Sequence, residues 1–466
     1  MVFPIVGGDG KPTGYEISNS LRFNDGDSPA LTRTMGAPTS TRKFTYVGWL
    51  KRSNLGIQSS FLSWGGSTYA TDFRYESSSN SLYFYFDDNT GWYAKTKSVY
   101  RDVSAWYQVV LAVDTTQATE SNRVKLYVNG TQYGSALDGT DWTQHEIFGQ
   151  NYDFPELANG QTMAIGKRNS SGSHFFDGYM SEVYFIDGQA LDSSYFGETD
   201  DNGVWIPKEY DGTYGNNGFL LQFKQTGTSQ NSSGIGADTS GNDNHFAVSN
   251  LAATDVTTDT PTNNFATLNP LAPINGGAPS TLPTFSEGST QITVGDGTTR
   301  FATGTFATSM PYYFEVKVSA ISGSDSDQRI GILDGDAIST STTYNSVYQG
   351  GGVITATGES NATGKDTLTA NDIIGVAVDL ATNNNIKFYE NGDLQATMSV
   401  GASYQGLTST PFARLVNATT TFQFNFGNPS FAISSGNADA NGYGNFEYAP
   451  PSGYYALCTK NLAQFG

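Results

Sequence analysis

The sequence has 466 residues, of which 13% are aromatic and only 15% are charged, and its formal net charge is −20. Nucleic acids and anionic membranes select patches of Lys and Arg, so this charge excludes both as expected partners. No apolar run approaches the roughly 20 residues needed to span a bilayer, so we expect no membrane insertion, and the single cysteine, Cys458, excludes an intramolecular disulfide framework.

The first half of the chain predicts a series of short strands separated by turns rich in Gly, Asn and Asp. Residues 43–52 alternate with period 2, which places Phe44, Tyr46 and Leu50 on one face of a strand. One helical turn is predicted at "LDSSYFGE", where Asp192 is suited to cap it. Further strands are predicted at residues 58–64, 72–77, 81–86, 106–114, 123–130, 161–168, 178–187 and 218–223.

The composition changes between about residues 231 and 286, where Thr, Asn, Pro and Gly accumulate. We expect the domain boundary near residue 270, with domain 1 at 1–270, a linker at 271–283, domain 2 at 284–435 and a tail at 436–466 that packs on domain 2. A second strand series follows at residues 291–295, 312–320, 328–335, 372–380, 385–392, 412–416 and 421–427. The predicted fold class is therefore all-β, with two antiparallel, jelly-roll-like β-sandwich domains joined by a Pro/Thr/Asn-rich linker.

The phrase "KLYVNG" at residues 125–130 is echoed by "KFYENG" at residues 387–392. In both places an apolar strand and a polar loop precede the phrase, which ends in Asn-Gly. Asn-Gly favours a two-residue type I′ turn, because that turn needs positive φ at both central positions. We therefore predict two β-hairpins, with turns at 129–130 and 391–392, and not a duplicated binding site.

Each series resembles a known family of β-sandwich domains. The first resembles the laminin-G-like, concanavalin A-like jelly rolls over residues 15–270, through "FTYVGWLKR", "WYQVVLAVD" with "VKLYVNG", and "FFDGYMSEVYFIDGQALDSSYF". The second resembles a SPRY domain over residues 284–435, through "YYFEVKV", "RIGILDG", "IIGVAVDLATNNNIKFYENG" and "FQFNFGNPSF".

The order of several phrases along the whole chain resembles bacteriophage tail-fibre-like or virion structural proteins. The phrases are "SNSLRFNDGDSP", "GVWIPKEYDGTYGNNGFLLQF", "DTSGNDNHFAVSNL", "TDTPTNNFATLNPL" and "APPSGYYALCTKNL". This resemblance implies a virion location after synthesis in the host cytoplasm, which agrees with an N-terminal stretch that lacks the features of a signal peptide. It also implies other virion proteins and a host-surface glycan or protein as partners, and a homo-oligomer for which a trimer is one candidate state.

Two alternatives to host-surface recognition remain open, namely a polysaccharide-degrading tailspike-type enzyme and a purely architectural particle subunit. A retaining glycosidase needs two carboxylates about 5 to 5.5 Å apart. The nearest candidates are Glu182 with Asp187, and Glu315 alone, and their spacing predicts no pair on one strand face. The three histidines lie in separate segments, so neither a zinc site nor a His-based triad is predicted. We therefore expect no enzymatic activity.

Two loops carry acidic residues around a glycine, as calcium loops do. They supply Asp25 and Asp27 in "NDGDSP", and Asp334 and Asp336 in "LDGDA". Neither fits the twelve-residue EF-hand pattern, and Asp-Gly pairs are common in ordinary turns. We expect no cofactor, with calcium at these loops as the open alternative.

Glycan binding would combine an aromatic platform with Asn, Asp or Gln side chains that bind sugar hydroxyls. Two loop stretches offer both components, "DDNTGWYAK" with Trp92 and Tyr93, and "FGQNYDFPE" with Tyr152 and Phe154. These four aromatic residues are the predicted glycan-binding candidates, although each would equally suit the core or a subunit interface.

Overall fold

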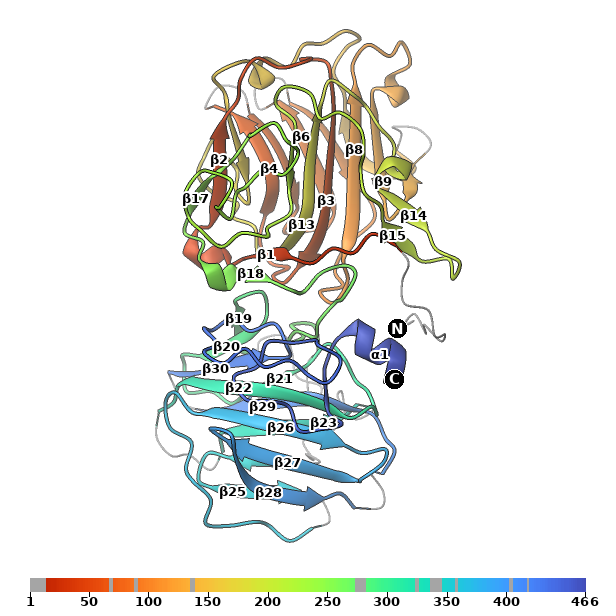
Figure 1. Ribbon diagram of the computed structural model, residues 1–466. Coiled ribbons are helices and arrows are strands. Elements are labelled where there is room, and N and C mark those ends of the chain that lie inside the picture. Colours follow the sequence, from red (N-terminus) through yellow and green to blue (C-terminus); the bar gives the residue numbers. More distant parts are fainter. Residues whose placement is uncertain are drawn as a thin grey trace. The chain divides into compact units, whose positions relative to one another are not determined.

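A computed structural model describes residues 14–66, 70–87, 91–134, 139–272, 282–322, 327–335, 346–356, 359–401, 405–416 and 419–466. The chain divides into two compact units, an N-terminal unit that ends at Thr262 and a C-terminal unit that begins at Asn263. Each unit is a β-sandwich, and Figure 1 follows them from red to green and from green to blue along the chain. The prediction of an all-β fold with two sandwich domains is thus confirmed.

The boundary between the units lies several residues before the position near 270 that composition suggested. Phe265, Ala266 and Leu268 are fully buried in the C-terminal unit, and the Ala266 backbone N–H donates to the Leu457 carbonyl oxygen at 2.9 Å. These residues therefore begin the second sandwich although they sit in a Thr- and Asn-rich stretch. Of the expected linker at 271–283, residues 273–281 lie outside the described residues.

The N-terminal unit contains two large antiparallel sheets and one small hairpin. In the first sheet the strand order is β10-β9-β8-β3-β13-β1-β18, with β16 also paired to β13, and in the second it is β11-β7-β6-β5-β4-β12-β2-β17. The strands are β1 (Ser20–Phe23), β2 (Ala30–Thr34), β3 (Lys43–Arg52), β4 (Ser59–Gly65), β5 (Ala70–Tyr75), β6 (Leu82–Asp87), β7 (Trp92–Thr96), β8 (Tyr107–Asp114), β9 (Val124–Val128), β10 (Thr131–Tyr133), β11 (Trp142–Glu146), β12 (Thr162–Ile165), β13 (Gly178–Asp187), β14 (Gly197–Thr199), β15 (Trp205–Pro207), β16 (Phe219–Leu221), β17 (Ala247–Ser249) and β18 (Val256–Thr257).

Short 3-10 turns connect several of these strands, at η1 (Asp25–Asp27), η2 (Glu120–Asn122), η3 (Pro155–Leu157), η4 (Ser193–Tyr195) and η5 (Ala253–Asp255). In η4 the Asp192 side chain accepts a hydrogen bond from the Ser194 backbone N–H, which confirms the predicted cap.

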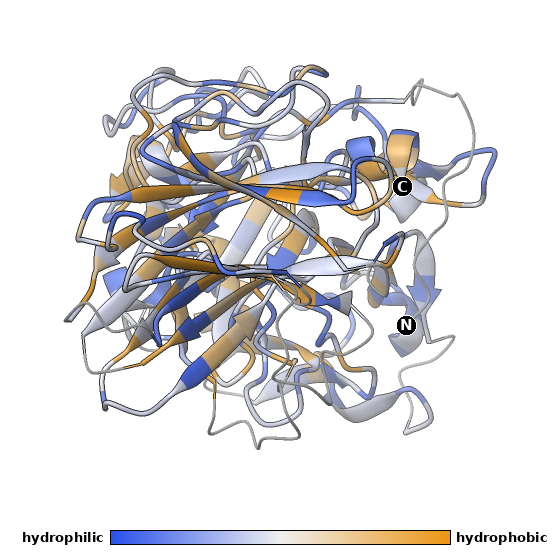
Figure 2. Cartoon of the chain, turned by 90° about the horizontal axis from the view of Figure 1, so that it is seen from below, coloured by the Kyte–Doolittle hydropathy of each residue, from blue (hydrophilic) through white to orange (hydrophobic). Residues whose placement is uncertain are grey.

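Aromatic residues from both sheets fill the core of the N-terminal unit. Tyr46 of the first sheet stacks on Phe61 of the second at 5.3 Å between ring centroids, and Phe44 meets Trp64 edge-on at 5.3 Å. Figure 2 shows the alternation of hydrophobic and hydrophilic residues along strands that such face-to-face packing produces. The predicted period-2 pattern of β3 is confirmed, because Phe44, Tyr46 and Leu50 all belong to this core.

The other face of β3 is also buried, under later parts of the same unit. Val47 packs with Phe196 and Tyr210, and the Lys51 ammonium makes a 2.8 Å ion pair with Asp259, in which both side chains are buried. A second layer thus covers this sheet, which explains why the face opposite the core carries both apolar and charged residues.

The C-terminal unit is a second two-sheet sandwich. One sheet has the order β19-β20-β30-β22-β26-β27-β28, with β31 parallel to β22, and the other has the order β21-β29-β23-β24-β25. The elements are β19 (Thr284–Ser286), β20 (Gln291–Val294), β21 (Arg300–Thr303), β22 (Tyr312–Ala320), β23 (Arg329–Asp334), β24 (Ser346–Gln349), β25 (Val353–Ala356), β26 (Ile373–Asp379), β27 (Asn385–Glu390), β28 (Asp393–Ser399), β29 (Ser409–Leu415), β30 (Thr420–Asn425), β31 (Tyr455–Ala456) and α1 (Thr459–Phe465).

The last part of the chain packs on the outer face of β22 in the C-terminal unit. Phe446 meets Tyr313 edge-on at 5.1 Å, and both join a buried cluster with Tyr454 and Cys458. Burial raises the pKa of the Cys458 thiol to about 12, so this cysteine is a core residue and not a reactive thiolate. Across the described residues, no helix has the length and apolar character needed to cross a membrane.

Both predicted Asn-Gly hairpins form. Asn129 and Gly130 have φ values of 46° and 80°, and Asn391 and Gly392 have values of 49° and 89°. Positive φ at both central residues is the signature of the type I′ turn, and these turns connect β9 to β10 and β27 to β28. The two phrases are therefore turns of two different sandwiches, as the sequence predicted.

Candidate recognition surface

The outer face of the second sheet of the N-terminal unit carries three tyrosines on neighbouring strands. Tyr83 and Tyr85 lie on β6 and Tyr93 lies on β7, directly opposite Tyr85 in the strand register. The intervening Phe84 and Ala94 point into the core, so the period-2 geometry of the strands puts the tyrosines on the other face. Ring centroids are 5.8 Å apart for Tyr83 and Tyr85 and 5.9 Å apart for Tyr83 and Tyr93, and all three rings are half-buried. We call these three residues the tyrosine strip.

Arg74 of β5 fixes one end of the tyrosine strip. Its guanidinium lies over the Tyr83 ring at 4.4 Å from the centroid, donates to Asp72 Oδ2 at 2.7 Å and lies 3.5 Å from Glu76 Oε2. Burial acts to raise the pKa of Asp72, but the His174 ring and the Arg74 guanidinium outweigh burial and lower that pKa. Asp72 is therefore an ionised anchor that positions Arg74 against the aromatic face.

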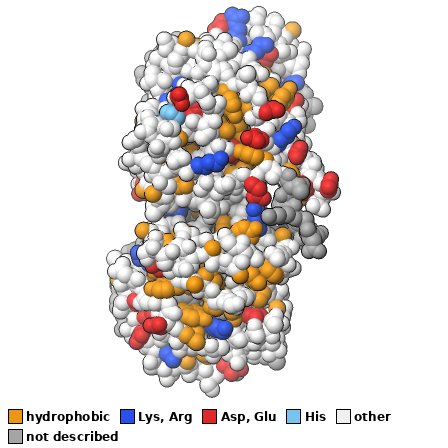
Figure 3. Space-filling view, viewed as in Figure 1, with side chains coloured by type: hydrophobic (Ala, Val, Ile, Leu, Met, Phe, Trp, Pro, Cys, Tyr) orange, Lys and Arg blue, Asp and Glu red, His pale blue; other side chains and the backbone are white. Residues whose placement is uncertain are grey.

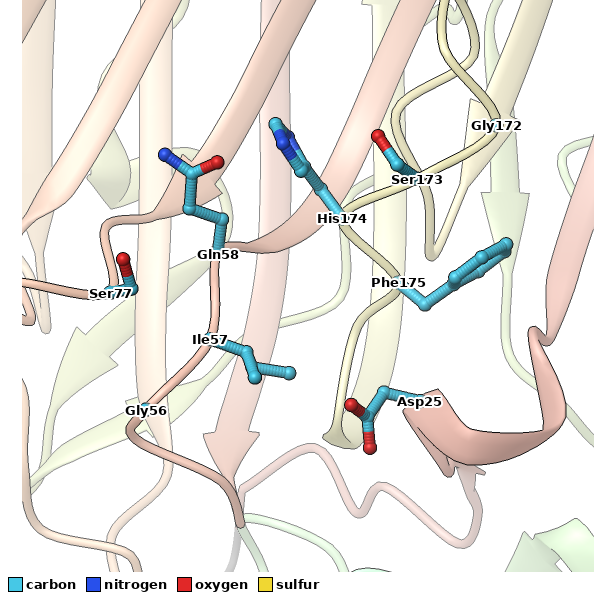
Figure 4. A pocket seen from close by; sticks show the side chains of 9 residues that line it. All are labelled: Asp25, Gly56, Ile57, Gln58, Ser77, Gly172, Ser173, His174 and Phe175. Atoms are coloured by element: carbon cyan, nitrogen blue, oxygen red, sulfur yellow. The ribbon is translucent and has the colours of Figure 1, made fainter.

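A shallow pocket opens at the rim of the sandwich next to this anchor. Its volume is about 420 Å³, within the range of small-ligand sites. Figure 4 shows the Asp25 carboxylate and the Ile57 side chain pointing toward one another across it, with Gln58 and His174 on another side. We call it the rim pocket, and it is lined by Asp25, Gly56, Ile57, Gln58, Ser77, Gly172, Ser173, His174 and Phe175.

Side-chain contacts connect the rim pocket to the acidic residues around Arg74. Gln58 donates to Glu76 Oε1 at 2.9 Å, and Nδ1 of His174 lies 3.5 Å from Asp72 Oδ2. His174 has a φ of 54°, an uncommon conformation for a residue other than glycine, and its carbonyl accepts from the Ser60 N–H at 2.8 Å. The rim pocket and the tyrosine strip are thus linked through the buried side chains of Asp72 and Arg74.

The structure separates the two acidic residues of the first predicted calcium loop. Asp25 lines the rim pocket and lies against the buried Asp177, whose Oδ2 accepts from the Asp25 backbone N–H at 3.4 Å. Asp27 is exposed and accepts from Asn24 Nδ2 at 2.8 Å. Burial raises the pKa of Asp177 well above its usual range, and the neighbouring Asp25 carboxyl adds to the rise.

The second predicted calcium loop is described only in part. Asp334 ends β23 and is half-buried, while Asp336 lies outside the described residues. Within the described ranges, no group of three or more His, Cys, Asp or Glu side chains is placed to hold a metal ion. Calcium binding stays an open alternative at both loops.

The four predicted glycan-binding aromatics divide between the core and the surface. Phe154 is 0% exposed, so the prediction for Phe154 is corrected, because a fully enclosed ring has no face to offer a sugar. Trp92 and Tyr152 meet edge-on at 4.4 Å and pack partly buried against the core. Tyr93 belongs to the tyrosine strip.

Sequence reasoning missed Tyr83, Tyr85, Arg74 and His174. The stretch "SLYFYF" has aromatic residues at both odd and even positions, so hydrophobicity alone does not indicate which face of the strand packs on the core. The tyrosine hydroxyls were the available signal, since alternating Tyr and Phe favours Tyr on the wetter face.

The carboxylates considered for catalysis all make structural hydrogen bonds. Glu182 accepts from the hydroxyls of Tyr184 at 2.6 Å and Tyr15 at 3.1 Å, and its φ of 47° marks the irregular pairing of β13 with β3. Asp187 accepts from the backbone N–H groups of Thr39 at 2.7 Å and Asn217 at 3.0 Å. Each carboxylate joins separate segments of the unit.

Glu315 of β22 likewise holds the last part of the chain in place. It accepts from the backbone N–H of Tyr448 at 2.8 Å and of Glu447 at 3.0 Å, and from the side chains of Asn425 and Tyr313 at 3.1 and 3.2 Å. Burial raises the pKa of Glu315 to about 7, against the opposing effect of these donors.

Comparison with protein families finds two domain matches, one in each unit. Residues 24–194 match the concanavalin A-like lectin/glucanases superfamily, and residues 311–429 match the SPRY domain. Comparison with curated proteins finds no match.

Several solved structures are similar to this chain over part or nearly all of its length. The heptameric SAP-like pentraxin from Limulus polyphemus is 17% identical with a TM-score of 0.29, and the match covers 39% of this chain and 81% of the pentraxin. The SPRY domain of human HERC1 is 15% identical with a TM-score of 0.26, over 29% of this chain and 87% of that domain. Domains LG4-5 of the mouse laminin alpha1 chain are 10% identical with a TM-score of 0.26, over 97% of this chain and 99% of theirs.

The family matches fall where the sequence resemblances placed them. Each match lies inside one of the two sandwich units, and together with the sheet topology they confirm the predicted pair of folds. The bacteriophage resemblance stays a prediction. The chain thus carries a laminin-G-like, concanavalin A-like domain in its N-terminal unit and a SPRY domain in its C-terminal unit.

Proposed function

We propose that this chain is a bacteriophage virion structural protein, tail-fibre-like or particle-decorating, that recognises a glycan on the host-cell surface. The observation that carries the recognition role is a lectin-like domain that combines a half-buried tyrosine strip with the rim pocket, the two being linked through Asp72 and Arg74. The ordered sequence phrases support the virion role, with other virion proteins and further copies of this chain as its partners.

The chemistry of the surface suits a sugar chain. Tyrosine rings offer apolar faces on which the C–H faces of pyranose rings stack, and their hydroxyls remain available to water or ligand. Gln58, Ser77 and Ser173 add amide and hydroxyl groups in the rim pocket. Such a mixture of flat apolar area and a few polar groups is typical of sites that bind small polar ligands.

Binding is a better supported role than catalysis. Glu182, Asp187 and Glu315 are each engaged in buried hydrogen bonds that join separate segments. A nucleic-acid partner is disfavoured because Lys and Arg are scattered singly over the described part of the face shown in Figure 3. Most of that surface consists of uncharged polar side chains and backbone.

A glycan array with the purified full chain tests the recognition role. We expect binding to a subset of bacterial surface glycans, and a loss of about tenfold or more in Tyr83→Ala and in Tyr85→Ala, the size typical of a stacked aromatic contact. Tyr195→Ala is the matched control, since Tyr195 is 47% exposed in the same unit but lies in η4, outside the strip. Binding unchanged in both strip variants would contradict the assignment of the site.

Proteomics and immunogold labelling of purified particles test the virion role separately. Absence of the chain from particles would overturn that role whatever the array shows. Presence in particles with no glycan binding would instead favour the architectural alternative, and depolymerisation of a host polysaccharide by the purified chain would favour the enzyme.

A further inference from the structure

The rim pocket has an acidic wall. Asp25 lines it directly, and Asp177 lies behind Asp25, with its carboxyl bonded by the Ser53 hydroxyl. Asp177 is buried, and burial raises its pKa well above its usual range. Asp25 is the member of the pair whose carboxyl group faces the pocket.

The cations near the pocket are already engaged with carboxylates. Arg74 bonds Asp72 and lies close to Glu76, so one guanidinium faces two acids. Burial acts to raise the pKa of Glu76, but Gln58 and Arg74 outweigh burial and lower it, so Glu76 is ionised beside the pocket. Among the described residues that line the pocket there is neither a lysine nor an arginine, and their one basic side chain is His174, which lies beside Asp72.

We propose that the rim pocket selects uncharged sugar residues, such as neutral hexoses, and rejects residues that carry a carboxylate or phosphate, with Asp25 as the residue that sets this specificity. The inference rests on the proposed function, because it names the class of glycan for the same surface. Like charges brought together in a partly dehydrated site repel strongly, so a single wall carboxylate is enough to discriminate against anionic ligands.

The remaining lining residues fit an uncharged pyranose. Ile57 and Phe175 supply apolar contact, while Gln58, Ser77 and Ser173 place an amide and two hydroxyl groups in the lining. A carboxylate accepts hydrogen bonds from the hydroxyls of a neutral sugar, and there is no charge on that sugar to repel. The Asp25 side chain therefore favours neutral sugars and disfavours acidic ones.

The test uses oligosaccharides that differ only in oxidation at C6, namely β-1,4-oligomannose and β-1,4-oligomannuronate, together with other neutral and uronic pairs from a glycan panel. For the wild-type chain we expect the neutral member of each bound pair to bind about tenfold or more tightly. Raising the salt concentration from about 0.05 to 0.5 M should shrink this ratio, because exposed charges are screened.

Asp25→Asn should bring the two affinities close together, chiefly by strengthening binding of the acidic member. Asp27→Asn is the matched control, because it removes the same charge from the same 3-10 turn at an exposed position away from the pocket lining. Asp25→Ser provides a second variant should the amide alter the contact with Asp177. Tryptophan fluorescence confirms that each variant is folded, since all six tryptophans lie in the N-terminal unit.

Equal or tighter binding of the acidic sugars by the wild-type chain would overturn the inference while leaving glycan recognition intact. An unchanged ratio in both Asp25 variants would overturn the role of Asp25. Binding to no glycan of the panel would overturn the proposed recognition function, and this inference with it.

Discussion

The outer faces of two sheets, one in each unit, carry similar residues but differ in exposure. On β22 of the C-terminal unit, Tyr313 and Glu315 face outward and are buried beneath residues 446–458. On β6 of the N-terminal unit, Tyr83 and Tyr85 also face outward, but their rings keep part of their surface exposed. Tyrosines beside charged groups occur on both faces, so the presence of a covering segment decides which face can meet a ligand.

The largest effect is expected when the covered face loses its carboxylate. Glu315→Ala would leave two partly buried backbone N–H donors without an acceptor, which costs about 3 kcal/mol of unfolding free energy. Glu447→Ala is the control, since its half-buried side chain bonds to the neighbouring Ser434 and Ser435 at the edge of the unit, so a loss below about 1 kcal/mol is expected.

Differential scanning calorimetry combined with hydrogen exchange of the C-terminal unit measures this loss. Tryptophan fluorescence serves as an internal reference, because the C-terminal unit contains no tryptophan and the signal reports the N-terminal unit alone. Equal stability of the Glu315→Ala and Glu447→Ala variants would contradict the view that Glu315 holds the covering segment.

The pH dependence of the covered face follows from the same residue. Burial raises the pKa of Glu315 from 4.5 to about 7, so between these values the folded state binds more protons than the unfolded state. The stability contributed by Glu315 is therefore fully present below about pH 4.5 and is lost as the pH rises through about 7. Calorimetry of the C-terminal unit should show that its unfolding free energy declines over this pH range in the wild type and depends less on pH in Glu315→Gln. The same pH dependence in both proteins would contradict the raised pKa of Glu315.

The smallest effect on stability is expected at the partly exposed face. Tyr83→Ala removes a half-buried ring and its contact with Arg74, so we expect a loss of about 1 kcal/mol in unfolding free energy. Urea unfolding followed by tryptophan fluorescence measures it. A loss as large as that in Glu315→Ala would mean that the tyrosine strip is part of the core and not a surface for ligands.

Much of the architecture could be predicted from the sequence, because it depends on local patterns. The period-2 strand of residues 43–52, the Asp192 cap and both Asn-Gly turns follow from the side-chain alternation and backbone preferences of neighbouring residues. The split into two sandwiches was likewise visible as two strand series on either side of a Pro- and Thr-rich stretch.

The candidate site was predicted less well, because exposure depends on residues distant in the chain. Tyr93 lies half-buried on the outer face of β7, whereas Phe154 is enclosed by Phe44, Phe86, Phe148 and Tyr152. In the sequence both residues belong to predicted aromatic loop stretches, and only the packing of other segments separates them.

The sequence by itself determined the two β-sandwiches, their strands and their turns, since these follow from periodicity and from residues that tolerate positive φ. The tertiary structure alone decided which faces are covered, where the second unit begins and which side chains meet at the rim pocket. Asp25 and His174 are 149 positions apart, and Gln58 and Ser77 come from two other segments. The backbone preferences of neighbouring residues do not determine such long-range contacts, because these contacts form only when the sheets pack and the rim loops come together.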